Sequence, residues 1–241
     1  METVVEIEHL KKSFGTNEVL KDINLKIEKG ENMVVFGKSG SGKSVLIKCL
    51  VGLLEPDDGK VVILGKNITE LKSGELDVLR KKIGFLFQSA ALYDSMTVRE
   101  NLEFPLRDLK KQKREEIDEL VLETLKSVGL EDAIDKMPSE LSGGMRKRVG
   151  LARTLILKPE IILYDEPTTG LDPITSKEIS QLILDVQKKY NAASIIITHD
   201  VECARITANK MVVIKEGECI AEGTFKELSE SEDEWVSSFF K

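Results

Sequence analysis

The sequence predicts an α/β fold with a mostly parallel central sheet flanked by helices, an antiparallel sheet at one edge and an inserted helical part. Three observations support this prediction. Short apolar, β-branched runs alternate with helical patterns in the last third of the chain, which is typical of a parallel sheet with crossover helices. The first third contains short runs in which apolar and polar residues alternate. Helical periodicity replaces the strands in between.

The first third of the chain is expected to form mainly strands. Val4–Glu8 and Ile23–Ile27 alternate apolar and polar residues, so they are predicted to be half-buried strands of an antiparallel edge sheet. Met33–Phe36 is continuously apolar, as in a strand that is buried on both faces. The other elements expected here are a buried helix over Val45–Leu50 and strands over Val61–Leu64 and Ile83–Phe87.

The middle of the chain, from about Thr97 to Leu157, is predicted to be helical. Its apolar residues recur at steps of three and four, which places a stripe on one side of a helix. The stripe consists of Ile117, Leu120, Val121, Leu125 and Val128. We therefore expect a helical subdomain over residues 90–158, inserted into a core formed by residues 1–89 and 159–225.

The β/α alternation returns after the helical part. Ile161–Tyr164 and Ser194–Ile197 are predicted strands, separated by a helix over Ile174–Lys189. A closing hairpin is expected over Met211–Ile220, with its turn at Glu216-Gly217. Residues 226–241 then form a short C-terminal extension of a domain that spans 1–241.

Composition restricts the classes of function. The 241 residues are 41% hydrophobic and 32% charged, as in soluble globular proteins. The net charge of −7 gives no overall attraction to nucleic acid, so no nucleic-acid partner is expected. Neither a signal peptide nor an apolar run of about 20 residues that could span a bilayer is evident. If the protein works at a membrane, something else must hold it there.

A phosphate-binding loop is predicted between the Met33–Phe36 strand and the helix that follows. Residues 37–44 read GKSGSGKS and match G-x-x-x-x-G-K-[ST] in full. Glycines let successive backbone N–H groups point inward at anionic oxygens, and the helix adds its dipole. Lys43 is expected to reach the β- and γ-phosphates and Ser44 to ligate Mg²⁺. The residues expected to bind ATP here are Gly37, Lys38, Ser39, Gly40, Ser41, Gly42, Lys43, Ser44 and Val45.

An acidic pair follows the Ile161–Tyr164 strand. Asp165 is expected to hold Mg²⁺, and Glu166 to accept the proton of an attacking water. Ligands bind beyond the carboxyl ends of such strands, where this pair lies. Taken alone, the pair could equally cap a helix before Pro167; the phosphate loop favours the metal and water-activating roles.

A second anion-binding helix terminus is predicted at Ser142-Gly143-Gly144, although in isolation the same residues describe an ordinary helix cap. The segment Leu141–Met145 resembles the signature motif of the ABC-transporter nucleotide-binding domain family, which is a P-loop NTPase family. The resemblance implies a homodimer in which the motif of one subunit completes the ATP site of the other, head to tail. It also implies ATP and Mg²⁺ as ligands.

The resemblance covers nearly the whole chain, in the order of the family's motifs. It implies that Phe14 stacks on adenine, with a core phenylalanine as the alternative. Gln88 matches the glutamine that contacts Mg²⁺ or water and relays the nucleotide state to membrane domains. Asp172 matches an aspartate that crosses the dimer interface, and His199 matches the histidine that bonds the γ-phosphate. The expected catalytic set is therefore Glu166, His199, Lys43 and Gln88, and the metal set is Ser44, Gln88 and Asp165.

Two segments are similar to the ATPases of phospholipid-trafficking systems, the maintenance-of-lipid-asymmetry type. They are Leu141–Thr154, with Met145 where most members carry glutamine, and Phe87–Leu106. In the family, the stretch after the glutamine helps form a groove for a permease helix. Apolar side chains there could line that groove or belong to the core. They are Leu92, Tyr93 and Met96.

The resemblance implies an ATPase subunit that energises transport through a separate permease, bound peripherally at the cytoplasmic face of the inner membrane. Phospholipid is the expected cargo, with amino acids, lipoproteins or other cargo as the alternative. A ribosome- or DNA-directed protein of the family usually carries two cassettes or a long coiled coil, and neither is evident. Glu166 and His199 argue against a regulator without turnover. The apolar segment Trp235–Phe240 could dock on its own domain or contact a partner.

Overall fold

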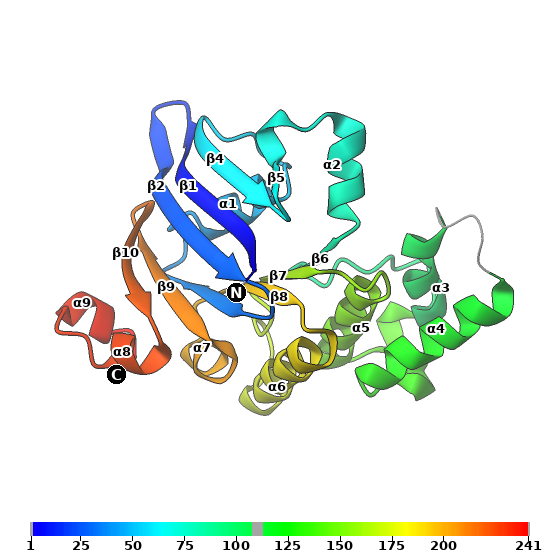
Figure 1. Ribbon diagram of the computed structural model, residues 1–241. Helices are drawn as coiled ribbons and strands as arrows, with labels where there is room; N and C mark the ends of the chain where they lie inside the picture. The colour runs from blue at the N-terminus through cyan, green and yellow to red at the C-terminus, as the bar shows by residue number, and fades with distance from the viewer. Residues whose placement is uncertain (1, 108–112, 241) are drawn as a thin grey trace.

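The computed structural model describes residues 2–107 and 113–240. Its strands form a ten-stranded sheet in the order β5-β4-β1-β2-β10-β9-β3-β8-β7-β6 (Figure 1). The strands are β1 (Thr3–Phe14), β2 (Asn17–Glu28), β3 (Asn32–Phe36), β4 (Asp58–Ile63), β5 (Lys66–Asn67), β6 (Ile83–Leu86), β7 (Ile161–Asp165), β8 (Ala193–Thr198), β9 (Lys210–Lys215) and β10 (Glu218–Gly223).

The helices lie on both sides of this sheet and beyond its β6 edge (Figure 1). They are α1 (Lys43–Leu50), α2 (Ser73–Arg80), α3 (Val98–Glu103), α4 (Arg114–Ser127), α5 (Gly143–Leu155), α6 (Pro173–Tyr190), α7 (Val201–Thr207), α8 (Phe225–Ser229) and α9 (Glu234–Ser237). In the described part of the chain, no helix is long and apolar enough to cross a bilayer.

The predicted α/β class is confirmed, with a parallel part and an antiparallel part. Strands β9, β3, β8, β7 and β6 run parallel to one another. Strands β2, β1, β4 and β5 pair antiparallel, which gives the expected edge sheet. The carboxyl ends of parallel strands share one edge of the sheet, so the loops after β3, β6, β7 and β8 are brought together there.

The central strand β3 separates two cores. Val34 and Phe36 belong to a cluster that includes side chains of α5 and α6. Met33 and Val35 belong to a second cluster, which includes side chains of α1. Successive side chains of a strand point to opposite faces, so a continuous apolar run is what a strand covered on both faces requires. The expected double burial of this strand is confirmed.

Helices α3, α4 and α5 all lie within residues 90–158, at one side of the sheet (Figure 1). On α4, Val121 and Leu125 are fully buried and Ile117 and Leu120 pack against the same core, which confirms the predicted stripe. Residues 108–112 of the expected helical part lie outside the described residues. The division of the chain into subdomains stays a prediction.

The closing hairpin is also confirmed, since β9 and β10 pair antiparallel around Glu216-Gly217. Both turn residues have positive φ, 49° and 83°, as a tight two-residue hairpin turn demands. The sequence did not predict α2, whose eight residues SGELDVLR bury Leu79 alone, nor the short helix α7. Helix α2 is mostly polar and α7 has only seven residues, so neither shows a helical period.

The segment after β6 is held by one buried amide. The Asn101 side chain accepts a hydrogen bond from the Tyr93 N–H (2.9 Å) and donates to the carbonyls of Tyr93, Met96 and Thr97. Asn101 is fully buried, so it ties the stretch from Tyr93 to Thr97 to α3.

Asn101→Ala should lower the free energy of unfolding by about 3 kcal/mol, because it leaves several backbone groups without partners in a buried place. Urea unfolding followed by circular dichroism measures the change. Asn17→Ala, at an exposed position, is the control and should stay within about 0.5 kcal/mol of the parent. Equal stability of the two variants would contradict the anchoring role of Asn101.

Candidate nucleotide site

The phosphate loop joins β3 to α1 and depends on glycine for its shape. Gly42 precedes α1 with a φ of 100°, in the left-handed region that favours glycine. A Cβ on Gly42 would lie 2.8 Å from the Val19 carbonyl oxygen, and one on Gly37 would lie 2.5 Å from that of Ile214. Side chains at these positions would push the loop away from the strands beside it.

Lys43 is buried beneath this loop. Its ammonium donates hydrogen bonds to the carbonyl oxygens of Gly37 (2.7 Å) and Lys38 (2.9 Å). Burial lowers the pKa of the Lys43 amine, while Glu166 and then Asp165 act to raise it. The ammonium is thus fixed inside the loop, where a phosphate would provide the anionic partner that two neutral carbonyls do not.

Asp165, at the end of β7, provides the carboxylate expected for a metal. Burial and then Glu166 raise the pKa of this carboxyl group, whereas Lys48 and the Ser44 hydroxyl act to lower it. Within the described residues, Asp165 Oδ1 and Ser41 Oγ are buried without a hydrogen-bond partner. Such orphaned oxygens are costly unless a ligand completes them.

These groups fit Mg²⁺ and phosphate. Mg²⁺ is usually held by one or two carboxylates together with substrate phosphates. In the part of the chain that the structure describes, no three His, Cys, Asp or Glu side chains gather as a metal site. Asp165 and the nearby Ser44 hydroxyl are therefore an incomplete set, which the phosphates of a bound nucleotide would complete.

Glu166 lies at a strained turn directly after β7. Its φ of 49° is in the left-handed region, which is uncommon for a residue with a side chain. The Glu166 N–H donates to the Ile197 carbonyl (2.9 Å), which ties the turn to β8. The carboxylate is within 2.8 Å of His199 Nδ1, and the Thr169 hydroxyl donates to it (3.2 Å).

His199 follows β8, and the next residue, Asp200, fixes the loop that carries it. The Asp200 carboxylate accepts bonds from the first N–H groups of α7 and from the Thr168 hydroxyl (2.8 Å). The loops after β7 and β8 are therefore locked together. The His199 side chain is 60% exposed, whereas that of Glu166 is 13% exposed, so the imidazole can meet a ligand while the carboxylate is shielded.

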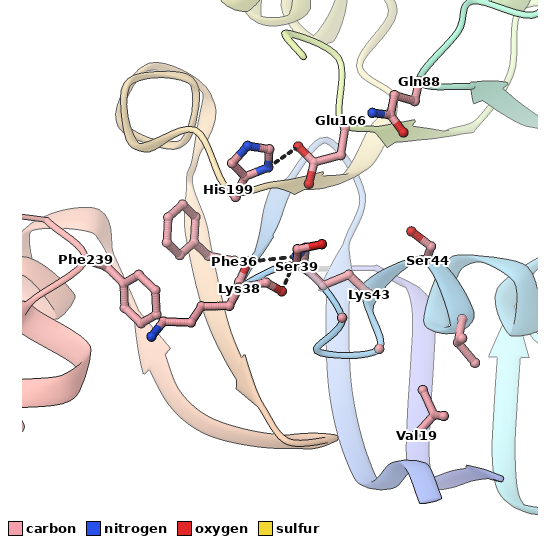
Figure 2. A pocket seen from close by; sticks show the side chains of 14 residues that line it. Val19, Phe36, Lys38, Ser39, Lys43, Ser44, Gln88, Glu166, His199 and Phe239 are labelled. Carbon is pink, nitrogen blue, oxygen red and sulfur yellow. Dashed lines mark hydrogen bonds and ion pairs between the residues drawn. The ribbon is translucent and has the colours of Figure 1, made fainter. Parts of the chain in front are cut away.

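One cavity of about 540 Å³ gathers most of these groups, although Asp165 and Ser41 do not line it. In Figure 2, Gln88, Glu166 and His199 lie on one side of it, and Lys43 and Ser44 lie on the facing side. Most of the residues predicted from the sequence line it. They are Gly37, Lys38, Ser39, Gly40, Gly42, Lys43, Ser44, Val45, Gln88, Glu166 and His199.

Phe14, predicted to stack on adenine, lies outside this cavity. It ends β1 and is 47% exposed, so the alternative of a core phenylalanine is wrong. Its neighbours Ser13 and Gly15 line a second cavity, which shares Val19 and Gly40 with the first. The exposed ring is thus beside a continuation of the phosphate site, and its stacking role stays a prediction.

The signature residues also lie outside the cavity. Ser142 and Gly143 are exposed at the start of α5, where the Ser142 hydroxyl accepts a bond from the Met145 N–H (3.2 Å). Gly144 is buried, and a Cβ on it would lie 2.5 Å from Thr175 Cγ2. Asp172 caps α6 through the N–H groups of Ile174 and Thr175 and the Thr175 hydroxyl.

The apolar residues after Gln88 divide between the two interpretations that the sequence left open. Leu92 packs against the core, and Met96 is partly buried. Tyr93 is 42% exposed, with its ring centroid 4.6 Å from that of Phe104. An aromatic surface therefore remains exposed at this position.

The C-terminal segment docks on its own domain beside the phosphate loop. Phe239 lines the cavity, and its ring centroid lies 5.4 Å from that of Phe36 (Figure 2). The Lys38 ammonium is 5.9 Å from the Trp235 ring centroid, and the Lys215 ammonium is 4.4 Å from it. The sequence missed Phe239, Phe36 and Val19 as cavity residues. Phe239 and Val19 belong to no motif, and Phe36 was predicted only as the last residue of a buried strand.

Comparisons with known proteins agree with this geometry. The family model described as ABC transporter matches residues 20–169. A probable ribonucleotide transport ATP-binding protein, Mkl of Mycobacterium leprae, is 43% identical over 99% of this chain and 69% of its own length. The mycobacterial relatives are thus longer proteins, of which the chain spans about two thirds (66% in Mycobacterium bovis).

Two further relatives are described as transporting other cargoes. The intermembrane phospholipid transport ATP-binding protein MlaF of Haemophilus influenzae is 38% identical over 100% of this chain and 91% of its own length. The methionine import ATP-binding protein MetN of Clostridium tetani is 39% identical over 93% of the chain and 70% of its length.

Two solved structures share the fold. CbiO1 of Clostridium perfringens, part of the ABC transporter complex cbiONQ, has a TM-score of 0.89 at 32% identity, over 99% of this chain and 94% of its own. A dimeric ATP-binding cassette in a post-hydrolysis state, bound to ADP and Pi, has a TM-score of 0.83 at 35% identity over 92% and 98%.

The phosphate loop, the acidic pair after a buried parallel strand and the shared fold define a P-loop ATPase domain. The chain belongs to the ABC transporter family.

Nucleotide binding should change the fluorescence of Trp235, which is the single tryptophan of the chain. Its ring lies near the Lys38 ammonium of the phosphate loop, so an anion bound in that loop changes the electric field at the indole. Titration with ADP should shift or quench the emission with saturation. Lys43→Ala, which weakens binding, should move the titration to higher concentration, and an unchanged emission would contradict the coupling between loop and tail.

Proposed function

We propose that the protein is the ATP-hydrolysing subunit of an ABC transporter and acts as a head-to-tail homodimer around two ATP molecules. The single observation that carries the proposal is the contrast between the two anion-binding termini. The phosphate loop, Glu166 and His199 share one cavity, whereas Ser142 and Gly143 are exposed outside it. Ser142 and Gly143 do not line the cavity of their own copy. Because they are exposed, they can reach the cavity of a second copy.

The chemistry follows from the groups in the cavity. Phosphoryl transfer depends mainly on positioning and charge stabilisation. Lys43 offers a fixed ammonium, and Mg²⁺ at Ser44 and Asp165 would neutralise phosphate charge. Glu166 is the group that accepts the proton of the attacking water, since its shielded carboxylate is oriented by His199 and Thr169. Gln88 and His199 line the same cavity and would contact the water, Mg²⁺ or the γ-phosphate once these are bound.

The dimer has support from symmetry and from one neighbour. A two-fold pair makes two identical composite sites from the same two surfaces. The solved cassette with a TM-score of 0.83 is described as dimeric, with ADP and Pi. We infer that Ser142, Gly143 and Gly144 of each copy complete the ATP site of the other, and that Asp172 lies at the shared interface. Phe14 stacks on the adenine from the β1 end.

The transported cargo is proposed to be phospholipid, moved by a separate transmembrane permease. MlaF of Haemophilus influenzae, which the chain matches over its whole length, is described as part of an intermembrane phospholipid transport system. Other relatives are described as ribonucleotide transport and methionine import proteins. Another cargo is therefore the alternative. The exposed Tyr93 surface is the proposed permease contact, which would hold the subunit peripherally at the cytoplasmic face of the inner membrane. Isolation with its permease, followed by mass spectrometry of bound lipid, tests the cargo.

Glu166→Gln should retain ATP binding but lower kcat for phosphate release by at least about 100-fold, because the amide cannot accept the proton. It should also accumulate ATP-bound dimers, measured by size-exclusion chromatography with light scattering. Glu160→Gln, at an exposed position just before β7, is the matched control and should hydrolyse normally. Parental turnover by Glu166→Gln would show that another group activates the water.

Mixing two inactive variants tests the composite site directly. Lys43→Ala removes the phosphate-loop ammonium, and Ser142→Phe blocks the signature terminus, so neither homodimer has a working site. A mixed dimer contains one site built from two intact surfaces. If subunits exchange freely, the mixture should reach about one quarter of the parental ATPase rate. A mixture as inactive as its components would contradict the head-to-tail arrangement.

A further inference from the structure

Helix α5 carries a buried ammonium that the proposed mechanism does not use. Lys147 is 5% exposed, although lysine is almost never fully buried without a partner. It lies one turn beyond the signature residues, on the face of α5 that turns toward the sheet. A buried charge is costly unless it is paired or hydrogen-bonded, so its contacts show what it does there.

The Lys147 ammonium bridges two loops of the nucleotide site. It donates to the Gln88 carbonyl oxygen at 2.6 Å and to the Glu166 carbonyl oxygen at 3.1 Å. Burial lowers the pKa of the Lys147 amine, and the carboxylates of Asp165 and then Glu166 oppose that effect. One side chain thus connects the end of β6, the end of β7 and the signature helix.

Two other α5 side chains contact β6 or the segment after it. Arg153 donates to the carbonyls of Ala90 and Ala91, and Thr154 donates to that of Phe85. Within the described residues, Lys147 is the α5 side chain that also donates a hydrogen bond to the loop after β7. This contact falls on Glu166, the residue in the left-handed conformation.

We propose that Lys147 is a positioning residue for hydrolysis, which holds the Glu166 peptide in its strained conformation and keeps it in register with Gln88. The inference rests on the proposed function. The Glu166 backbone is fixed from two sides: its N–H donates to the Ile197 carbonyl, and its carbonyl accepts a hydrogen bond from the Lys147 ammonium. Without the second bond the turn can relax toward a more favourable φ, and the carboxylate then leaves the position from which it meets water.

Lys147→Met keeps the apolar stem and removes the donors. It should lower kcat about 10- to 100-fold, as expected when a catalytic group is displaced by about 1 Å, while KM for ATP changes less than about threefold. Lys147→Gln keeps two amide N–H donors on a shorter stem and should fall between the parent and Lys147→Met. Arg148→Met is the matched control, because Arg148 is the next residue of α5 and donates to the Val128 carbonyl and to the Glu178 carboxylate on α6, not to Gln88 or Glu166.

A double-mutant cycle with Glu166→Gln separates positioning from a general structural effect. If Lys147 acts through the Glu166 carboxylate, then Lys147→Met should slow single-turnover hydrolysis less than about twofold in the Glu166→Gln background. An undiminished effect there, a parental kcat for Lys147→Met, or a rise in KM equal to the loss in kcat would each overturn the proposal. Should Lys147→Met not fold, a loss of kcat in Lys147→Gln that disappears with Glu166→Gln supports it, and a parental kcat overturns it.

Different results would contradict the ATPase function and the positioning role of Lys147. If the parent does not hydrolyse ATP, or if Glu166→Gln turns over like the parent, the proposed function fails first. If the parent is active and Glu166→Gln is slow, but Lys147→Met behaves like Arg148→Met, then the positioning role alone is wrong.

Discussion

The parallel pairing of β3, β8, β7 and β6 is the constraint on which the rest of the structure depends. It brings four loop origins to one edge of the sheet, although they are distant in the sequence. The register is fixed by two cores, because side chains of β3 alternate between them. A slip by one residue would exchange the two faces and move every loop residue from its place. The site therefore depends on the packing of the sheet more than on any contact within the site.

Polar contacts then refine what the sheet has brought together. The Asp200 carboxylate joins the loops after β7 and β8, and the Lys147 ammonium joins those after β6 and β7. The first contact involves Asp200, which is adjacent to His199. The second ends on Glu166 itself. The carboxylate and imidazole are thus placed by their neighbours before any ligand arrives, which lowers the reorganisation needed during the reaction.

Much of the site could be predicted from the sequence, because its residues are local. Gly37–Ser44 and the acidic pair after Ile161–Tyr164 are short contiguous motifs whose chemistry depends on neighbours in the chain. Phe239 and Lys147 could not be predicted, since their roles arise from contacts with residues far away in sequence. Helix α2 was missed for a different reason: it is short and mostly polar, and tertiary contacts such as those of Leu79 stabilise it rather than its own periodicity.

Asp172 keeps room for one more hydrogen-bond donor. In the single subunit its carboxylate accepts three hydrogen bonds from the first turn of α6, two on Oδ1 and one on Oδ2. An ionised carboxylate offers about four acceptor positions, so one position on Oδ2 is left. In the proposed dimer, a donor from the other subunit can take that position while the helix cap stays intact. The same carboxylate that begins α6 is thus held rigidly in place for a contact with a second chain.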